Sequence, residues 1–262
     1  MKLIDTHCHI HESDYPLDRA TVLRDAATAN VTEIFCIGTD VESSRDAVRF
    51  AREFDGKFGV KISATVGAHP HHAKDLVDAD YDVLKKLATE AVGMGEIGLD
   101  YFYEFSPRKA QIAALERQLQ IAVDHNLPVV FHTRDGGKNS YSAFDDIWSI
   151  IDNFPGIRGI FHSFTDTREN LKRAVDRGFF IGVNGIMTFN KNPEQAEMYR
   201  TIPLDRMVIE TDAPFLSPKP FRGKTNQPSY VRNIAEFIAS THSVSLAKIA
   251  NQTTKNALSV FT

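Results

Sequence analysis

Eight short apolar segments recur at even intervals along the 262-residue chain, and a longer amphipathic segment follows each of them. Nearly continuous apolar segments are typical of parallel strands that are buried on both faces. The segments are LIDTHCHI (3–10), EIFCIG (33–38), ISATVGAH (62–69), AVGMGEIGLD (91–100), LPVVFHT (127–133), RGIFHSF (158–164), FFIGVNG (179–185) and MVIETD (207–212). Eight evenly spaced strands predict an α/β protein with the (β/α)8 TIM-barrel fold; a doubly wound open sheet, which is the alternative, more often has about five to seven.

The segments between the apolar runs have helical periodicity. The clearest is SPRKAQIAALERQLQIAVDHN (106–126), for which we expect Ser106 as the cap, Pro107 in the first turn and an apolar face of Ile112, Leu115, Leu119 and Ala122. Asn192 and Pro193 predict the start of another helix in the same way. No linker rich in Pro, Gly or Ser divides the chain, so we expect one domain over residues 1–262.

Composition excludes several classes of protein. A 42% hydrophobic and 24% charged content is ordinary for a globular protein, and the formal charge of −4 argues against a generally basic nucleic-acid coat without excluding a local phosphate site. Two cysteines, Cys8 and Cys36, cannot form a disulfide framework and suit a reducing compartment. The N-terminus does not read as a signal peptide, and no apolar run is long enough to span a membrane. We therefore expect a cytoplasmic protein, monomeric by default and without an obligate protein partner.

One glycine pattern is misleading. Gly93, Gly95 and Gly98 match the dinucleotide-binding pattern G-x-G-x-x-G, but they lie inside a predicted strand rather than between a strand and a helix. We expect these small residues to let a neighbouring group approach the backbone closely instead.

Polar side chains gather where the predicted strands end. The first strand contains the motif DTHCH. Its alternating residues Asp5, His7 and His9 should point to one face of the strand, and Cys8 should point away from the barrel interior. The other strands end with or carry His69, Glu96 and Asp100, His132 and Arg134, His162, and Glu210 and Asp212. The active site of a parallel barrel lies at the carboxyl ends of its strands, so these groups should meet at one mouth.

Imidazoles and carboxylates that converge in this way predict a metal centre, because unpartnered buried polar groups are costly and these donors suit divalent ions. A single catalytic ion rarely needs more than three protein ligands, so this many donors indicates two ions. Glu96 is placed to bridge the ions, and Asp212 to bind one ion and accept a proton from the attacking water.

Several motifs occur in order over residues 4 to about 230: IDTHCHIH, GAHPH, GEIGLDY, LPVVFHTRD, FHSFT and IETDAPFLSPKPFRGKTNQP. Together they resemble the TatD family of metal-dependent deoxyribonucleases in the amidohydrolase superfamily. The resemblance implies a (β/α)8 barrel and a divalent-metal-dependent hydrolase of DNA phosphodiester bonds, acting as an exonuclease on single strands or 3′ ends. It implies two divalent ions (Mg, Mn or Zn) held by six ligands: His7, His9, Glu96, His132, His162 and Asp212.

A phosphodiester substrate requires groups that hold a phosphate. Candidates near the predicted mouth are His69, Arg134, Lys219, Arg222 and Lys224, and arginine binds phosphate bidentately. Two departures from the family pattern are expected to affect the loops rather than the ligands. Asn226-Gln227-Pro228 stands where relatives usually have Asn-Glu-Pro, and the segment RDGGKNSY (134–141) is rich in glycine.

Two other functions fit the same donors. Amidohydrolase-type esterases, lactonases and amidases use related metal-rich barrels, but many of them bridge the ions with a modified lysine, and here Glu96 occupies that strand. A barrel that binds metal or nucleic acid without turnover is the remaining alternative, although no expected ligand is missing from the sequence.

Overall fold

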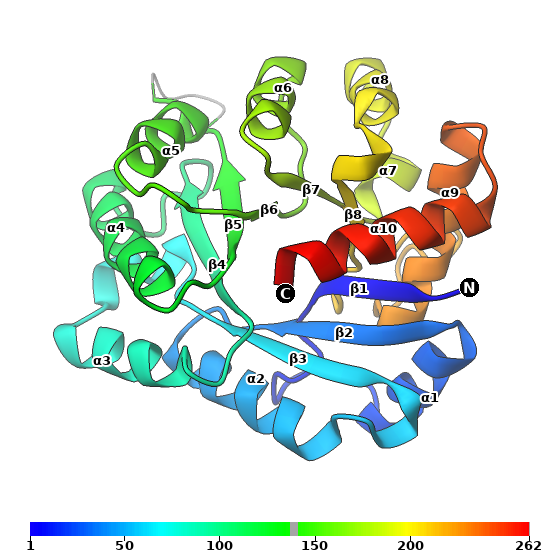
Figure 1. Ribbon diagram of the computed structural model, residues 1–262, viewed down its shortest axis with the longest axis horizontal. Coiled ribbons are helices and arrows are strands. Elements are labelled where there is room, and N and C mark those ends of the chain that lie inside the picture. Colours follow the sequence, from blue (N-terminus) through cyan, green and yellow to red (C-terminus); the bar gives the residue numbers. More distant parts are fainter. Residues whose placement is uncertain (137–140, 262) are drawn as a thin grey trace.

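The computed structural model describes residues 1–136 and 141–261. Within these residues, eight parallel strands form one sheet in the order β1-β2-β3-β4-β5-β6-β7-β8, and the helices pack around it (Figure 1). The strands are β1 Leu3–Cys8, β2 Val31–Ile37, β3 Lys61–Val66, β4 Gly93–Asp100, β5 Val129–Arg134, β6 Gly159–Phe161, β7 Phe180–Val183 and β8 Met207–Ile209. All eight predicted strands are present, and the predicted TIM-barrel fold is confirmed.

Helices connect each strand to the next. They are α1 Arg19–Thr28, α2 Val41–Phe54, α3 Asp78–Leu87, α4 Arg108–Asp124, α5 Ala143–Ile151, α6 Arg168–Asp176, α7 Ile186–Phe189, α8 Pro193–Thr201, α9 Val231–Thr241 and α10 Leu246–Phe261. Short 3-10 turns are η1 Lys57–Gly59, η2 Pro70–Asp75, η3 Leu204–Arg206 and η4 Pro228–Tyr230. None of the helices in the described part of the chain is long and apolar enough to cross a membrane.

Helix starts follow local side-chain chemistry, with one correction. Asn192 caps α8 by accepting a hydrogen bond from the Glu194 N–H, as predicted. The prediction that Ser106 caps α4 is wrong, because α4 begins after Pro107 and the Ser106 hydroxyl is used elsewhere. It accepts a hydrogen bond from the Lys74 N–H and donates one to the His71 carbonyl, which fastens η2 to the loop before α4.

The barrel closes between its first and last strands. Beyond β8, Ala213 pairs with Cys8, the His9 N–H donates to the Ala213 carbonyl at 2.7 Å, and the Asp212 N–H donates to the His7 carbonyl at 2.8 Å. Closure leaves the chain segments that carry His7 and Asp212 directly bonded to each other, at the carboxyl end of the barrel.

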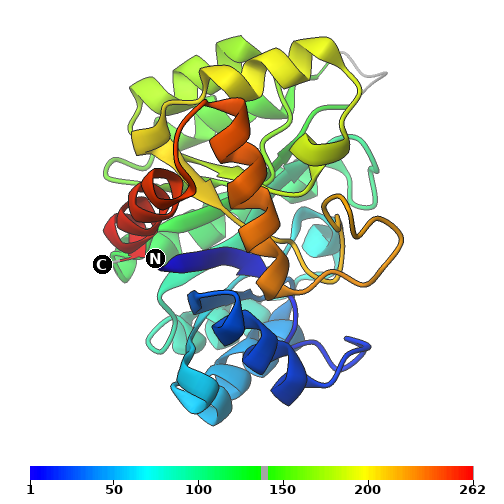
Figure 2. The same ribbon diagram turned by 90° about the vertical axis from the view of Figure 1, so that its right-hand side faces the viewer.

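The opposite end of the barrel is filled by apolar side chains. Ile4, Phe35, Ile160 and Val208 come from four strands and form one cluster with Ala257 and Val260 of α10. The Phe261 ring stacks on Phe35 with 4.1 Å between centroids. Both chain ends lie on this side of the molecule, and the loop after β8 projects from the other side (Figure 2).

Two of the glycines in the misleading G-x-G-x-x-G pattern lie against β5, and all three lie within β4. A Cβ atom on Gly95 would lie 2.6 Å from the Val130 side chain. Gly98 has φ +151°, and a Cβ atom there would lie only 1.8 Å from the His132 carbonyl oxygen. The predicted close approach is therefore confirmed, and it is what brings His132 beside β4.

We expect Gly98→Ala to lower the free energy of unfolding by at least about 2 kcal/mol, since an unfavourable backbone conformation adds to a steric clash. Gly156→Ala is the matched control, because Gly156 has φ +89° and a Cβ atom there would have no neighbour within 4 Å. It should cost only the backbone term, about 1 kcal/mol. Urea denaturation measures both. Equal losses would contradict the assigned role of the β4–β5 contact.

Candidate metal centre

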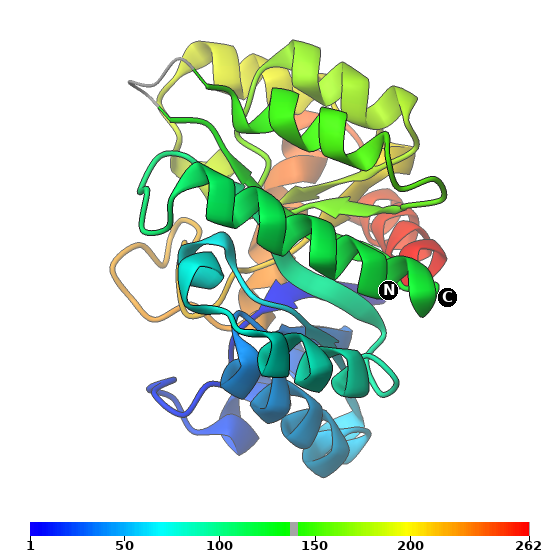
Figure 3. The ribbon, with the colours of Figure 1, turned by 90° about the vertical axis from the view of Figure 1, so that its left-hand side faces the viewer.

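The six residues predicted as metal ligands come from five strands or the residues just after them. His7 lies in β1, His9 one residue beyond it, Glu96 in β4 and His132 in β5. His162 follows β6, and Asp212 lies three residues after β8. The loops after β3, β4 and β8 surround the same side of the barrel, away from the chain ends (Figure 3). The structure brings all six side chains into one cluster.

Glu96 lies at the centre of this cluster, with a side chain only 5% exposed. Its Oε2 atom is 3.3 Å from His7 Nε2 and 4.0 Å from His9 Nε2. Its other oxygen, Oε1, is 2.7 Å from His132 Nδ1 and 3.6 Å from His69 Nε2. One carboxylate therefore faces two separate groups of imidazoles.

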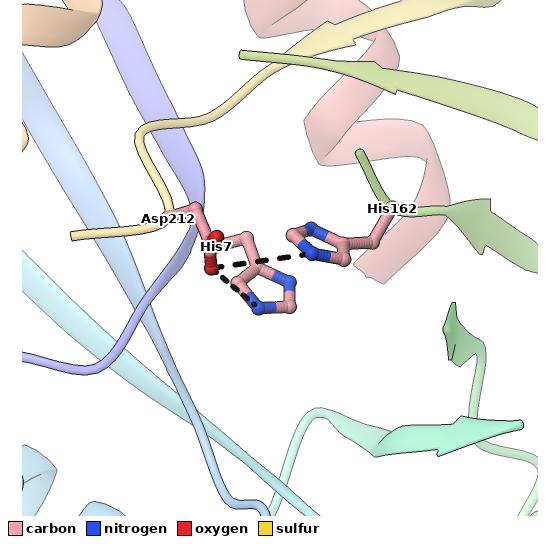
Figure 4. Close-up of side chains that lie close together, drawn as sticks. All are labelled: His7, His162 and Asp212. Atoms are coloured by element: carbon pink, nitrogen blue, oxygen red, sulfur yellow. Dashed lines mark ion pairs between the residues drawn. The ribbon is translucent and has the colours of Figure 1, made fainter. Parts of the chain in front are cut away.

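The first donor group consists of His7, His9, Glu96 and Asp212. The Nε2 atoms of His7 and His9 are 3.1 Å apart. The Asp212 Oδ1 atom lies 3.6 Å from the first and 3.4 Å from the second. Figure 4 shows Asp212 facing both His7 and His162. The rings of these two histidines stack on each other with 3.5 Å between centroids.

These separations fit a shared cation. Ligand atoms about 2.1 Å from one ion lie about 3.0–3.4 Å from each other in octahedral or tetrahedral geometry. Most separations in the first donor group fall in or close to this range. Imidazole nitrogens with carboxylate oxygens are also the donor chemistry that Zn and Mn accept. The residues present therefore fit a divalent metal ion.

The second donor group has Glu96 Oε1, His132 Nδ1 and His69 Nε2. His162 Nε2 lies between the two groups, 3.9 Å from Glu96 Oε1 and 4.0 Å from Asp212 Oδ1.

Two carboxylates orient the rings of His132 and His162 from behind. Asp100 Oδ2 lies 2.9 Å from His132 Nε2, so His132 presents Nδ1 to the cluster. Glu210 Oε1 lies 2.9 Å from His162 Nδ1, so His162 presents Nε2. Carboxylates placed behind ligating histidines fix ring orientation in metal sites.

Electrostatics in the cluster keep the carboxylates ionised. Burial favours the neutral acid, but the neighbouring imidazoles, the charge of His162 first among them, hold the pKa of Glu96 well below its usual range. Burial also lowers the pKa of His9, yet the hydrogen bond and charge of Asp212 raise it to about 9. Metal binding to these imidazoles would displace such protons, because ligands must be deprotonated.

His7 and His69 differ from His9, His132 and His162, because burial lowers the pKa of both rings. For His7 the charge of His162 also contributes to the lower pKa, so that His7 favours the neutral ring with a free nitrogen lone pair. A neutral imidazole is the form that binds a metal.

Asp5 does not join the donor cluster. Burial raises the pKa of Asp5 to about 8, and its carboxyl group accepts hydrogen bonds from the Thr211 N–H at 2.8 Å and the Thr211 hydroxyl at 2.5 Å. The His7 N–H also donates to it, at 3.3 Å. β1 is irregular between Asp5 and Cys8, where its register with β2 shifts. The buried Asp5 is thus satisfied by hydrogen bonds that tie β1 to the end of β8.

Several parts of the site do not follow from the sequence. His69 is predicted to contact substrate, and the structure places it within the second donor group. Asp100 and Glu210 are predicted at strand ends without a role, and His71, for which the sequence predicts no chemistry, lies 3.0 Å from Asp100. The sequence shows that Asp100 lies four residues after Glu96 and Glu210 two residues before Asp212. This spacing places both acids near the site, but it does not say which imidazole each acid contacts.

Of the predicted phosphate-binding cations, Arg134 is the last residue of β5, whereas Lys219, Arg222 and Lys224 lie in the loop after β8. Three of them stand beside an aromatic ring. The Arg134 guanidinium lies 4.1 Å from the Phe102 centroid, Arg222 lies 3.7 Å from Phe189, and the Lys224 ammonium lies 5.9 Å from Phe221. The Lys219 N–H bonds to the Thr188 hydroxyl. Their contact with substrate stays a prediction.

Asn226 orders the rim loop that departs from the family pattern. Its side-chain amide donates to the Thr211 carbonyl at 2.7 Å and to the Phe215 carbonyl at 2.5 Å. Gln227 contributes its backbone N–H to the Asn226 side chain. In the other departure, residues 137–140 of the glycine-rich segment lie outside the described residues.

Comparison with known proteins places the chain in a family. The model of the family described as TatD related DNase matches residues 4–262. The chain is 35% identical to the uncharacterized metal-dependent hydrolase YabD of Bacillus subtilis, over 99% of this chain and 98% of that protein. It is 32% identical to the 3′-5′ ssDNA/RNA exonuclease TatD of Salmonella typhimurium, again over 99% and 98%.

Solved structures agree. The TatD homologue YJJV of Escherichia coli superposes with a TM-score of 0.87 at 25% identity, covering 99% of this chain and 97% of that one. A TatD-family hydrolase of Entamoeba histolytica gives 0.88 at 21% identity, covering 100% and 98%. A family match over nearly the whole chain, together with relatives above 30% identity, shows that the chain belongs to the TatD-related DNase family of metal-dependent hydrolases.

Proposed function

We propose that residues 1–262 act as one divalent-metal-dependent phosphodiesterase that removes nucleotides from the 3′ end of single-stranded DNA. The observation that supports the proposal most directly is the Glu96 carboxylate, whose two oxygens face two separate groups of imidazoles. The name of the Salmonella typhimurium relative, a 3′-5′ ssDNA/RNA exonuclease, supports this substrate and polarity and adds RNA as a second substrate. Cytoplasmic location and a monomeric state stay predictions.

In this proposal His7, His9, Glu96 and Asp212 hold one ion, and Glu96, His132 and His162 hold the other. Divalent ions bound there would supply the positive charge that activates water and neutralises the phosphodiester. Three distances support the first set of ligands. The Nε2 atoms of His7 and His9 are 3.1 Å apart. His7 Nε2 is 3.3 Å from Glu96 Oε2, and His9 Nε2 is 3.4 Å from Asp212 Oδ1.

Asp212 is the proposed proton acceptor. Burial favours its neutral form, but the hydrogen bond from His9 and then the charge of His162 hold its pKa below the usual range. Its carboxylate is therefore ionised and able to accept the proton of an attacking water. Arg134, Arg222 and Lys224 are the proposed phosphate contacts, since Arg134 ends β5 and the other two lie in the loop after β8, at the same mouth of the barrel.

Chelation should abolish release of nucleotides from 3′- and 5′-labelled single-stranded oligonucleotides, and added Mg, Mn or Zn should restore it. Glu96→Gln and His132→Ala should each lose more than the roughly 10–100-fold typical of residues behind the ligands. His125→Ala is the matched control, because His125 ends α4 and bonds to the Ile121 carbonyl. It should keep normal activity.

Near-normal activity of either ligand variant would contradict the proposal. Turnover of lactone or amide substrates without cleavage of any oligonucleotide would instead assign the centre to the related amidohydrolase chemistry.

His69 and His162 provide a test of ligand identity, because Glu96 Oε1 is 3.6 Å from one and 3.9 Å from the other. We expect His162→Ala to lower the bound metal from two ions to one per chain. His69→Ala should keep both ions and raise KM, since His69 is proposed to contact substrate. Metal analysis after dialysis measures the stoichiometry. Loss of an ion in His69→Ala but not in His162→Ala would show that His69 is the metal ligand and His162 the substrate contact.

Asp100→Asn tests how His132 is oriented. The Phe102 and Tyr103 N–H groups donate to Asp100 Oδ1, and the amide oxygen of Asn keeps that acceptor. The change removes the negative charge beside His132 Nε2, so we expect about 10–100-fold weaker metal binding with an unchanged melting temperature. Titration calorimetry measures the affinity. Unchanged metal affinity would show that the carboxylate does not tune this ligand.

A further inference from the structure

Exposed aromatic side chains gather on the loop between β4 and α4. Phe102 is 50% exposed, Tyr103 is 49% exposed and Phe105 is 55% exposed, within four residues of chain. Leaving this much ring surface in water forgoes the stabilisation that burial would give. Large exposed apolar groups that stand together mark binding sites more often than isolated ones do.

These three residues, here called the aromatic cluster, are arranged by contacts among their rings. Phe102 meets Tyr103 edge to face with 4.9 Å between centroids. Tyr103 and Phe105 are nearly parallel, at 6° and 5.5 Å. The cluster therefore forms an ordered aromatic surface.

The aromatic cluster is fixed to the metal centre through one carboxylate. Asp100 accepts hydrogen bonds from the Phe102 and Tyr103 N–H groups at 2.9 and 3.0 Å. The same side chain contacts His71 and His132 Nε2. The His71 ring in turn lies 4.8 Å from Phe105. Asp100 thus connects the aromatic cluster directly to His132, a proposed ligand.

A cation lies on the aromatic cluster. The Arg134 guanidinium is 4.1 Å from the Phe102 centroid and 4.8 Å from the Tyr103 centroid. A guanidinium in this position can bind a phosphate at its edge while its flat face rests on the rings. Positive charge beside exposed rings is the combination that recognises a single nucleic-acid strand.

A further exposed ring borders the first donor group. Phe215 is 57% exposed, and its ring lies 6.5 Å from that of His9. The Phe215 N–H donates to the Asp212 carbonyl at 2.8 Å, which ties the ring to a proposed ligand. Aromatic surface therefore borders both donor groups of the metal centre.

We propose that the aromatic cluster is a stacking platform for the unpaired bases of the substrate strand, with Arg134 on a backbone phosphate and Phe215 against a base on the other side of the scissile bond. The inference rests on the proposed function and adds how the substrate is selected. Bases in a duplex are stacked on one another and offer no free face to the platform. The platform thus selects single strands with little preference for sequence, because every base has a stacking face.

The test combines a protein change with a substrate change. Tyr103→Leu/Phe105→Leu keeps apolar volume and removes two rings, and an oligonucleotide with abasic residues at its 3′ end keeps the phosphates and removes the bases. Fluorescence anisotropy measures binding, and release of label measures cleavage. We expect the double variant to bind the normal strand about 5- to 100-fold more weakly and the abasic strand nearly unchanged.

Phe58→Leu is the matched control. Phe58 is an exposed aromatic residue with Arg24 4.9 Å from its centroid, but it precedes β3 and so lies at the opposite end of the barrel. It should leave binding of both strands unchanged.

Each outcome separates the two proposals. Cleavage of both strands with no dependence on the bases, or equal weakening of both strands in the double variant, overturns the platform and keeps the phosphodiesterase. Base-dependent binding that the double variant loses, without cleavage under any metal, overturns the phosphodiesterase and keeps the platform. No binding and no cleavage overturns both.

Discussion

The buried carboxyl group of Asp5 joins the first strand of the barrel to the last, and the geometry of the candidate metal centre depends on that junction. Its hydrogen bonds with Thr211 hold the end of β8 against β1. The backbone bonds between His7 and Asp212 and between His9 and Ala213 follow directly beyond it. Because these pairings are short and buried, the donors from opposite ends of the chain are held within 3.6 Å of one another. Such preorganisation lowers the cost of assembling a site.

Carboxylates outside the proposed ligand set decide how the histidines face the site. Asp100 directs Nδ1 of His132 inward, whereas Glu210 directs Nε2 of His162 inward. Asp100 also anchors the loop that carries the aromatic cluster, so ligand orientation and the proposed strand-binding surface share one support. Its Oδ1 atom holds the loop, and its Oδ2 atom contacts His132. The proposed ligand and the proposed strand-binding surface therefore depend on the same side chain.

The two ends of the barrel differ in chemistry as much as in position. One end is closed by apolar side chains from the strands and α10, which contribute stability. The other carries buried imidazoles and carboxylates whose mutual charges shift several pKa values, and around them stand aromatic and basic side chains on loops. Loops tolerate such exposed groups because the scaffold below them supplies the free energy of folding. This division is general for parallel barrels, in which conserved geometry at one end supports varied loops at the other.

The sequence by itself determined the eight strands, the fold and the set of donors that meet at one mouth, because strand alternation and strand ends are local properties of the chain. It also identified Gly95 and Gly98 as sites of close approach, since only an absent side chain permits such contact. Tertiary structure alone decided which acid supports which imidazole, why Ser106 serves η2 rather than α4, and how near His69 lies to Glu96. These relations join residues many positions apart, and they depend on strand register, loop path and ring rotation. Spacing along the chain carries no information about distances of this kind, which exist only once the barrel has closed.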